Sequence, residues 1–208
     1  MKDVLDILGN VPATKETVAS LYPGVSGSNQ KVASMERGGK LLRLKRGLYI
    51  VNPAVSGKPI SLELIANHLY SPSYVSMLTA LSWYGLIPER VYLIQSMTLK
   101  HSRVFENAFG RFSYINVSRD YFPIGIRHVE AEVASFLIAS PEKALCDYIC
   151  STPGINLRYQ KEAEAFLEED MRFDMDLFSQ FNADILRQCA DVGKKKQTIE
   201  TIIKLLGR

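Results

Sequence analysis

The sequence of 208 residues contains only three cysteines, Cys146, Cys150 and Cys189, and no long apolar run. Three cysteines form neither a disulfide framework nor a zinc pattern, and their odd number suits reduced thiols. No segment approaches the roughly 18 consecutive apolar residues of a membrane helix. The first ten residues carry acidic side chains and no apolar block, so we expect no secretory signal. These absences predict a cytoplasmic protein that does not contact a membrane.

The sequence also lacks the motifs of common catalytic sites. It has no phosphate-binding glycine loop and no Gly-x-Ser-x-Gly segment. Cys146 and Cys150 lie one helical turn apart, but no second Cys/His pair completes a metal site, which favours core thiols. His128 and Glu130 have the His-x-Glu spacing of zinc deaminases without the Pro-Cys-x-x-Cys partner. We therefore predict that the protein is not an enzyme and uses no metal or cofactor.

Positive charge is concentrated in the first quarter of the chain. Residues 1–57 contain eight lysines and arginines against four acidic residues, whereas the remainder contains 17 basic and 18 acidic residues. Most of the basic surplus lies between Lys31 and Arg46. A local basic patch is typical of a phosphate-binding surface. Nucleic-acid contacts are therefore expected in residues 1–57, and the larger remainder is not expected to be a second general nucleic-acid surface.

Residues 39–52, GKLLRLKRGLYIVN, predict a β-hairpin with a basic tip. Apolar and basic residues alternate in its first strand and should face opposite sides. The apolar pair is Leu42 and Leu44, and the basic pair is Arg43 and Lys45. Gly47 can adopt the left-handed conformation of a tight reversal, and residues 48–51 suit the return strand. Lys45 and Arg46 would lie at the tip.

Three short helices are predicted before this hairpin. The first contains Val4 and Leu8, and Thr14 can cap the second, over residues 15–21. Ser28 can cap the third, over residues 29–37, with Val32 and Met35 facing inward. Together, helix, helix, turn, helix and basic hairpin predict a winged helix-turn-helix domain in residues 1–57.

The outer face of the third helix is small and polar at its N-terminal end. Asn and Gln side chains can read an adenine edge, and the first residues of a recognition helix reach the bases. A solvated face is the alternative for the helix alone, but the attached basic hairpin favours DNA binding. The predicted DNA-binding residues are Ser28, Asn29, Gln30, Lys31, Ser34, Arg37, Lys40, Arg43, Lys45 and Arg46.

Residues 58–208 predict a larger α+β domain with a small antiparallel sheet and C-terminal helices. Ser71-Pro72 and Ser140-Pro141 each have the cap-and-proline signature of a helix start. The first of these helices should run to about Tyr84, with Trp83 and Tyr84 in the core. Aromatic and branched residues indicate the strands, at residues 91–98, 112–117, 126–131 and 133–139. The amphipathic helices expected at the end are residues 159–168, 176–190 and 198–206.

Two alternative functions remain open at this point. Glu130 and Glu132 would share a strand face, which suits a magnesium-dependent nuclease or nucleotide-modifying enzyme tethered to DNA. The acidic run between Glu162 and Asp170 could instead dock a basic protein, in which case the winged helix would bind protein. A solvated helix face is the simpler interpretation of this acidic run. The three lysines at residues 194–196 are likewise most simply interpreted as a solvated loop.

Three stretches resemble the AbiEi-type antitoxins of bacteria. The hairpin, GKLLRLKRGLYIVNP, is similar to their N-terminal winged helix, which often reads Gly-x-Leu-x-Arg-Leu-x-Arg-Gly-x-Tyr. The other two stretches are residues 74–89 (YVSMLTALSWYGLIPE) and 139–148 (ASPEKALCDY). The hairpin residues that match the pattern are Gly39, Leu41, Arg43, Leu44, Arg46, Gly47 and Tyr49. The resemblance covers the first domain and the centre of the second, and ends at about residue 156.

This resemblance implies an antitoxin of a type IV toxin–antitoxin system of the kind used in phage defence. Its winged helix would bind inverted repeats of double-stranded DNA in the promoter of its own operon and repress transcription. Its C-terminal domain would counteract a nucleotidyltransferase-like toxin encoded beside it, without a stable complex.

Overall fold

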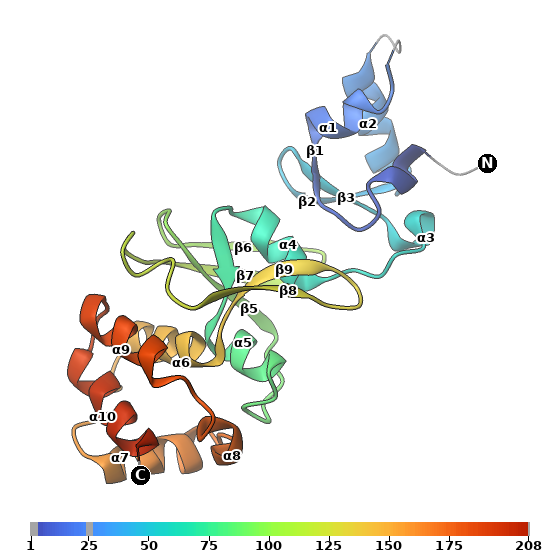
Figure 1. The fold of residues 1–208 in the computed structure, drawn as a ribbon. Helices are drawn as coiled ribbons and strands as arrows, with labels where there is room; N and C mark the ends of the chain where they lie inside the picture. Colours follow the sequence, from blue (N-terminus) through green and yellow to red (C-terminus); the bar gives the residue numbers. More distant parts are fainter. Residues whose placement is uncertain (1–3, 24–26, 208) are drawn as a thin grey trace.

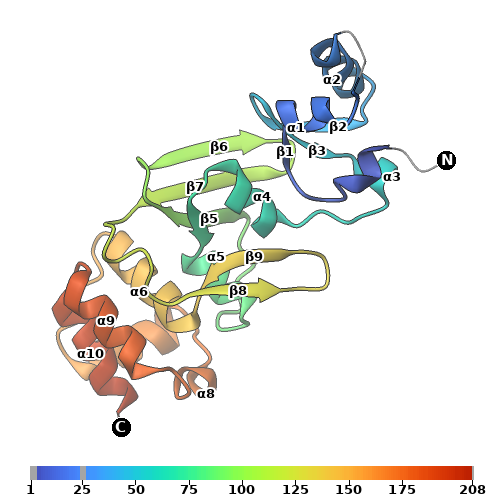
Figure 2. The same cartoon turned by 45° about the horizontal axis from the view of Figure 1, so that its top comes forward.

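The computed structural model describes residues 4–23 and 27–207, with only the backbone described for Ser28 and Asn29, and has an α+β fold. A small N-terminal unit lies at one end, a sheet forms the middle, and the C-terminal helices gather at the opposite end (Figure 1). The turned view shows the N-terminal unit beside the end of the sheet that carries β6 and β7 (Figure 2).

The N-terminal unit combines three helical segments with a three-stranded antiparallel sheet in the order β1-β3-β2. Its elements are η1 (Val4–Ile7), β1 (Ala13–Thr14), α1 (Lys15–Ser20), α2 (Ser28–Arg37), β2 (Leu41–Lys45) and β3 (Leu48–Val51). Thr14 caps α1 as predicted, because its side chain accepts a hydrogen bond from the Thr17 amide. The cap predicted at Ser28 is wrong by one residue, since Gly27 occupies the N-cap position of α2 with φ +85°.

Strand β3 of the β2–β3 hairpin is buried on both faces. Tyr49 and Val51 belong to the core of the N-terminal unit, together with Val32 and Met35 of α2. The alternate positions of the same strand, Leu48 and Ile50, join the core of the larger part of the chain. Because successive side chains of a strand point to opposite faces, one short hairpin contributes to two cores. The hairpin therefore joins the N-terminal unit to the remainder of the molecule.

A β-bulge changes the direction of Lys45. Arg43 pairs with Tyr49, but Lys45 pairs with Leu48, so the register shifts between Arg43 and Lys45. A bulge adds one residue to one strand and interrupts its alternation. Leu44 and Lys45 consequently both face the larger part of the chain. The expectation that Lys45 shares a face with Arg43 is wrong for this reason, whereas Gly47 takes the predicted left-handed conformation, with φ +79°.

The central sheet has six strands and is mixed, which corrects the prediction of a small antiparallel sheet. Its strands are β4 (Ser73–Val75), β5 (Leu93–Thr98), β6 (Arg103–Asn107), β7 (Gly110–Asn116), β8 (Ile126–Glu130) and β9 (Ser135–Ala139). The order is β6-β7-β5-β4-β9-β8, with β5 parallel to β7 and β4 parallel to β9. The chain leaves β5 for the edge position of β6 and then returns, so that β7 inserts between β5 and β6.

The helix predicted from Pro72 begins later than expected. Residues 73–75 form β4, which pairs with β5 on one side and β9 on the other, and α5 (Met77–Trp83) begins only after Ser76. All three β4 side chains are buried, so sheet pairing overrides the local helix-start signal. Trp83 is 41% exposed rather than in the core, with its ring edge-on to Tyr84 and Phe136.

The remaining helices surround the sheet and build the C-terminal end. They are α3 (Pro53–Ser56), α4 (Leu62–Leu69), α6 (Pro141–Ser151), α7 (Gln160–Ala165), the π-helix η2 (Phe166–Asp170), α8 (Met175–Phe178), α9 (Ala183–Val192) and α10 (Lys196–Leu206). Ser140 caps α6, as predicted, and Ser61 caps α4. The helix expected over residues 176–190 is divided into α8 and α9, with Asn182 capping α9. Within the described ranges no helix is long and apolar enough to cross a membrane.

Candidate nucleic-acid interface

Helix α2 presents a polar and basic face to solvent. Val32 and Met35 are buried, as the sequence predicts, which fixes the orientation of the helix. The positions on its other side are exposed, and they are Gln30, Lys31, Ala33, Ser34 and Arg37. The predicted contacts Ser28 and Asn29 lie in the first turn of this helix, and their side chains are outside the described residues.

A shallow cavity of about 360 Å³ adjoins this face of α2. Its lining includes Lys31, Ser34 and Lys40, three of the predicted DNA-binding residues, together with Tyr22. The Lys31 ammonium lies 5.8 Å from the centroid of the Tyr22 ring. The structure thus brings a polar hydroxyl and two cations together around one concave surface, which suits a phosphate or the edge of a base.

Arg43 and Arg46 belong to the hairpin but differ in their surroundings. The Arg43 guanidinium forms an ion pair with Glu36 of α2, with an N–O distance of 2.7 Å, while its side chain remains 56% exposed. The hydrogen bond with Glu36 raises the pKa of Arg43 above its ordinary value. Arg46 is exposed at the turn, and neither it nor Arg37 forms an ion pair within the described part of the chain. The side chains of Arg37 and Arg46 are therefore open to solvent.

Lys45 points away from solvent and into the junction with the larger part of the chain. Its ammonium donates a hydrogen bond of 2.5 Å to the Leu69 carbonyl and lies 5.8 Å from the Phe105 ring centroid. Burial lowers its pKa, and the positive charges of Lys100 and Arg103 lower it further. Among the predicted DNA-binding residues whose side chains the structure describes, Lys45 is the one that bonds to the larger part of the chain, where it is half-buried.

Lys45 forms a cation cluster with Lys100 and Arg103, two residues that are not among the predicted DNA-binding residues. We call these three residues the basic junction. The Lys100 ammonium lies 5.2 Å from the Tyr70 ring centroid, and the Arg103 guanidinium lies 4.8 Å from that of Phe105. In the sequence, Lys100 and Arg103 belong to a basic segment, Lys100-His101-Ser102-Arg103, that lies far from the hairpin, so the chain order does not indicate that these charges meet. These three positive charges lie around two aromatic rings and together raise the local electrostatic potential.

The groups considered for alternative chemistry do not converge. His128 and Glu130 lie on the edge strand β8, and Glu132 lies in the turn after it, so the two glutamates do not share a strand face. His128, Glu130 and Glu132 are all exposed. Among the described residues, no group of three or more His, Cys, Asp or Glu side chains could hold a metal ion.

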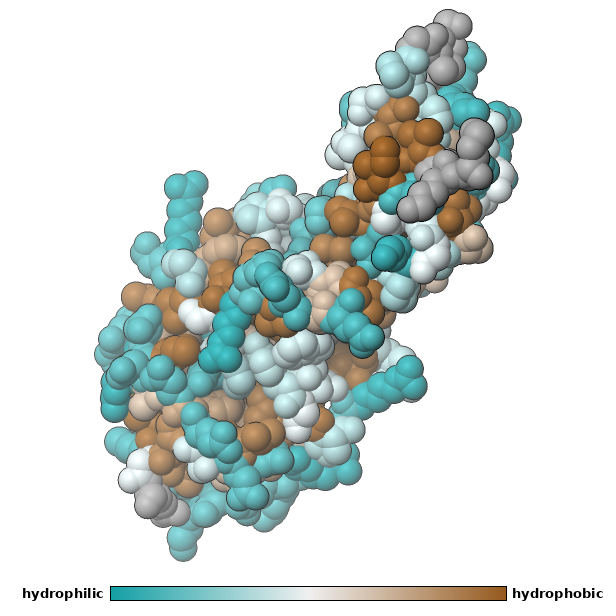
Figure 3. Space-filling model, turned by 45° about the vertical axis from the view of Figure 1, so that its right-hand side comes forward, coloured by the Kyte–Doolittle hydropathy of each residue, from teal (hydrophilic) through white to brown (hydrophobic). Residues whose placement is uncertain are grey.

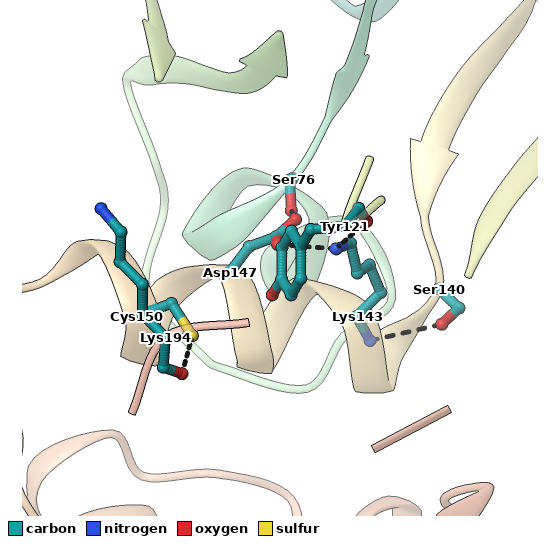
Figure 4. Close-up of polar contacts among 7 residues, drawn as sticks. All are labelled: Ser76, Tyr121, Ser140, Lys143, Asp147, Cys150 and Lys194. Atoms are coloured by element: carbon teal, nitrogen blue, oxygen red, sulfur yellow. Dashed lines mark hydrogen bonds and ion pairs between the residues drawn. The ribbon is translucent and has the colours of Figure 1, made fainter. Parts of the chain in front are cut away.

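A buried polar cluster on α6 was also missed by the sequence analysis. Lys143 and Asp147 are both 0% exposed, and their charged atoms lie 3.3 Å apart. Ser76 donates a hydrogen bond of 2.6 Å to the Asp147 carboxylate, and Lys143 donates one of 3.0 Å to the Tyr121 carbonyl (Figure 4). Burial raises the pKa of Asp147 against the opposing effect of Lys143. The available signal was the Lys-x-x-x-Asp spacing, which places both groups on one helix face.

This cluster has a structural role that follows from its position. It joins β4–α5 to α6, the two segments that carry the second and third stretches of the antitoxin-like pattern.

No protein-family model matches the chain, and a comparison with curated proteins finds no match either.

Proposed function

We propose that this chain is a winged helix-turn-helix DNA-binding repressor of its own operon and the antitoxin of a type IV toxin–antitoxin system. The observation that carries the DNA-binding part is the exposed polar and basic face of α2, beside the arginines of the β2–β3 hairpin. The opposite face of α2 forms the core of the N-terminal unit, so folding fixes the orientation of the exposed face.

The dimensions of α2 suit the major groove of DNA. A helix of 10 residues is about 15 Å long, and a major groove about 12 Å wide admits one helix. Gln30 lies in the first turn, where a recognition helix contacts bases, and an amide side chain can bind an adenine edge through two hydrogen bonds. Lys31, Arg37 and Arg46 then contact phosphates and fix the orientation of the protein on the duplex.

The basic junction extends this proposed surface toward the sheet. Arg103 is the first residue of β6 and Lys100 lies in the bend before it, and both are exposed next to the hairpin. A duplex held by α2 and Arg46 would carry a phosphate past these two cations, where the neighbouring Lys45 reinforces the positive potential. This part of the proposal revises the expectation that DNA contacts are confined to residues 1–57.

Sequence specificity is the property that tests the repressor function. We expect the protein to bind a duplex carrying the inverted repeats upstream of its own gene more tightly than a shuffled duplex of equal length. Gln30→Ala should reduce that preference by about 1–3 kcal/mol, the value of one bidentate base contact. Gln188→Ala, an exposed glutamine on α9, is the matched control. Fluorescence anisotropy titrations at one salt concentration measure both, and equal affinity for the two duplexes would contradict the proposal.

The antitoxin part of the proposal is supported by the resemblance of residues 74–89 and 139–148. These two segments pack together through the bond between Ser76 and Asp147, so the similar stretches belong to one structural unit. Its test is co-expression with the nucleotidyltransferase-like gene expected beside this one. Growth should recover when the full chain is present and should also recover with Arg37→Ala/Arg46→Ala, because the proposed DNA contacts are separate. Failure of the full chain to restore growth would refute the antitoxin role.

A further inference from the structure

A cavity of about 510 Å³ lies at the edge of the central sheet where β5 and β7 end. These two strands are parallel, so their carboxyl ends, at Thr98 and Asn116, meet at the same edge. The last residues of α6 and the segment between α9 and α10 complete the lining. The crevice outside the carboxyl ends of parallel strands is where open sheets bind ligands, and the volume lies within the roughly 300–1,000 Å³ of small-molecule sites.

The inner part of this cavity is apolar. Met97 is 0% exposed and Tyr121 is 4% exposed, so these two residues form its floor. Ile115 and Val117, which are half-buried, and Val192, which is 46% exposed, form its walls. Removing apolar surface from water is favourable. A ligand whose own apolar surface covers these walls would therefore be stabilised in the cavity.

The outer part of the cavity is polar. Asn116, Ser118 and Lys194 are exposed at its rim, and Ser151 is half-buried beside them. In the described part of the chain, the two serine hydroxyls and the Lys194 ammonium have no hydrogen-bond or ion-pair partner. The backbone of this rim is anchored, because the Cys150 thiol donates a hydrogen bond of 2.9 Å to the Lys194 carbonyl (Figure 4). A fixed rim thus offers several hydrogen-bond donors to a ligand.

The charge of the lining indicates the charge of the ligand. Among the described residues that line the cavity, Lys194 is the one that is charged at neutral pH. Burial raises the pKa of Tyr121 and raises that of Cys150 to about 11, so both side chains stay neutral. One positive charge matches one negative charge. A carboxylate carries a single charge at neutral pH, whereas a phosphate monoester carries close to two.

We propose that this cavity binds a small organic carboxylate with an apolar body. The carboxylate accepts hydrogen bonds from the Lys194 ammonium and the Ser118 hydroxyl at the rim. The apolar body of the ligand covers Ile115, Val117 and Val192. The N-terminal unit with its proposed DNA-binding face lies at the opposite end of the molecule (Figure 1), so this site is separate from the proposed DNA interface.

Naphthoate, an aromatic carboxylate, is the probe that tests this assignment. The sequence contains six methionines, and NMR spectra of isotope-labelled methionine methyl groups report on each of them. Met97 lies on the cavity floor, whereas Met35 belongs to the core of the N-terminal unit. We expect a saturable shift of the Met97 signal, identified by its loss in Met97→Leu, while the Met35 signal stays unchanged. Absence of a saturable Met97 shift would overturn the proposal.

A neutral probe separates the charge of the ligand from its apolar body. Naphthalenemethanol has the same ring system but no carboxylate, so it should bind about five- to tenfold more weakly than naphthoate. Lys194→Ala should weaken naphthoate by a similar factor and leave naphthalenemethanol unchanged. The matched control is Lys196→Ala, an exposed lysine that pairs with Asp191 and lies outside the lining. Equal affinities for the two probes in the wild type would refute recognition of a carboxylate, as would unchanged naphthoate binding in Lys194→Ala.

A bulky substitution tests the location of the site. Ser118→Trp places a large side chain at the exposed rim and should weaken both probes. Full binding of both probes by Ser118→Trp would show that they occupy another place. None of these readouts depends on DNA binding or on the antitoxin role.

Discussion

The buried pair of Lys143 and Asp147 gives the sharpest prediction about stability. Replacing Asp147 by alanine removes the carboxylate that lies 3.3 Å from the Lys143 ammonium and that accepts the hydrogen bond of Ser76. Both charged side chains are 0% exposed, so bulk solvent does not reach the Lys143 ammonium. The substitution leaves one positive charge without its counter-charge in the core between α5, α6 and the sheet.

The expected cost follows from this burial. Breaking a buried ion pair by removing one partner costs about 3–5 kcal/mol, because an uncompensated charge remains. For a chain of 150–250 residues each kcal/mol shifts the melting temperature by about 2–4 °C, so Asp147→Ala should lower it by about 6–20 °C. Burial raises the pKa of Asp147, and Lys143 and Ser76 act in the opposite direction, so burial of the charged pair carries a cost that apolar side chains would avoid. Replacing both charges, as in Lys143→Met/Asp147→Leu, should therefore restore most of the stability.

Urea denaturation followed by circular dichroism measures these differences. The control is the surface pair of Lys196 and Asp191, which has the same 3.3 Å separation but side chains 58% and 68% exposed. Asp191→Ala should cost less than about 1 kcal/mol, as exposed pairs do. If Asp147→Ala and Asp191→Ala had equal effects, or if the double replacement were no more stable than Asp147→Ala, the reasoning from burial would be wrong.

Three further predictions concern the N-terminal unit and its junction. Leu44→Ala should destabilise the protein by about 2–5 kcal/mol, the range for buried leucines. Leu44 is 3% exposed and belongs to the core of the larger part of the chain. A denaturation midpoint equal to that of the wild type would contradict this prediction. Backbone and Thr14 hydrogen bonds lower the pKa of Glu16, so its stabilising effect should be present above the unfolded value of 4.5 and lost as pH falls through the folded pKa. Glu16→Gln should therefore be less stable than the wild type at pH 7 and equal to it in strong acid, and a pH-independent difference would refute this. Lys100→Ala should reduce the salt dependence of DNA binding by about one unit, whereas the exposed Lys161→Ala on α7 should not, and equal slopes would remove the basic junction from the interface.

Local signals predicted the N-terminal elements well. Thr14 and Gly47 act as the sequence predicts, because an N-cap and a left-handed turn depend on a few neighbouring residues. The inward positions of Val32 and Met35 were also correct, since helical periodicity identifies a buried face. The bulge at Lys45 was not predictable, because the backbone of the hairpin adjusts to a partner surface formed by distant residues.

Non-local pairing explains the errors in the larger part of the chain. The segment after Ser71 has a helix-start signal, but β5 and β9 recruit residues 73–75 into the sheet. Similarly, Lys143 and Asp147 read as ordinary polar positions of an amphipathic helix until Ser76 and Tyr121 close over them. The space-filling view shows apolar side chains gathered on one face of the N-terminal unit (Figure 3). The exposed large apolar residues of this unit include Val4, Ile7 and Val11. Periodicity assigned Val4 to a short helix but did not predict its exposure.

The salt dependence of DNA binding tests the central claim most directly. The affinity for the promoter duplex is measured by fluorescence anisotropy over a range of potassium chloride concentrations, for the wild type and for Arg37→Ala/Arg46→Ala. If α2 and the hairpin hold phosphates, the slope of log affinity against log salt should become shallower by about two units, one for each lost contact. The matched control is Arg158→Ala/Lys204→Ala, two exposed cations near the C-terminal helices, which should keep the wild-type slope. An unchanged slope in Arg37→Ala/Arg46→Ala would contradict the proposed interface.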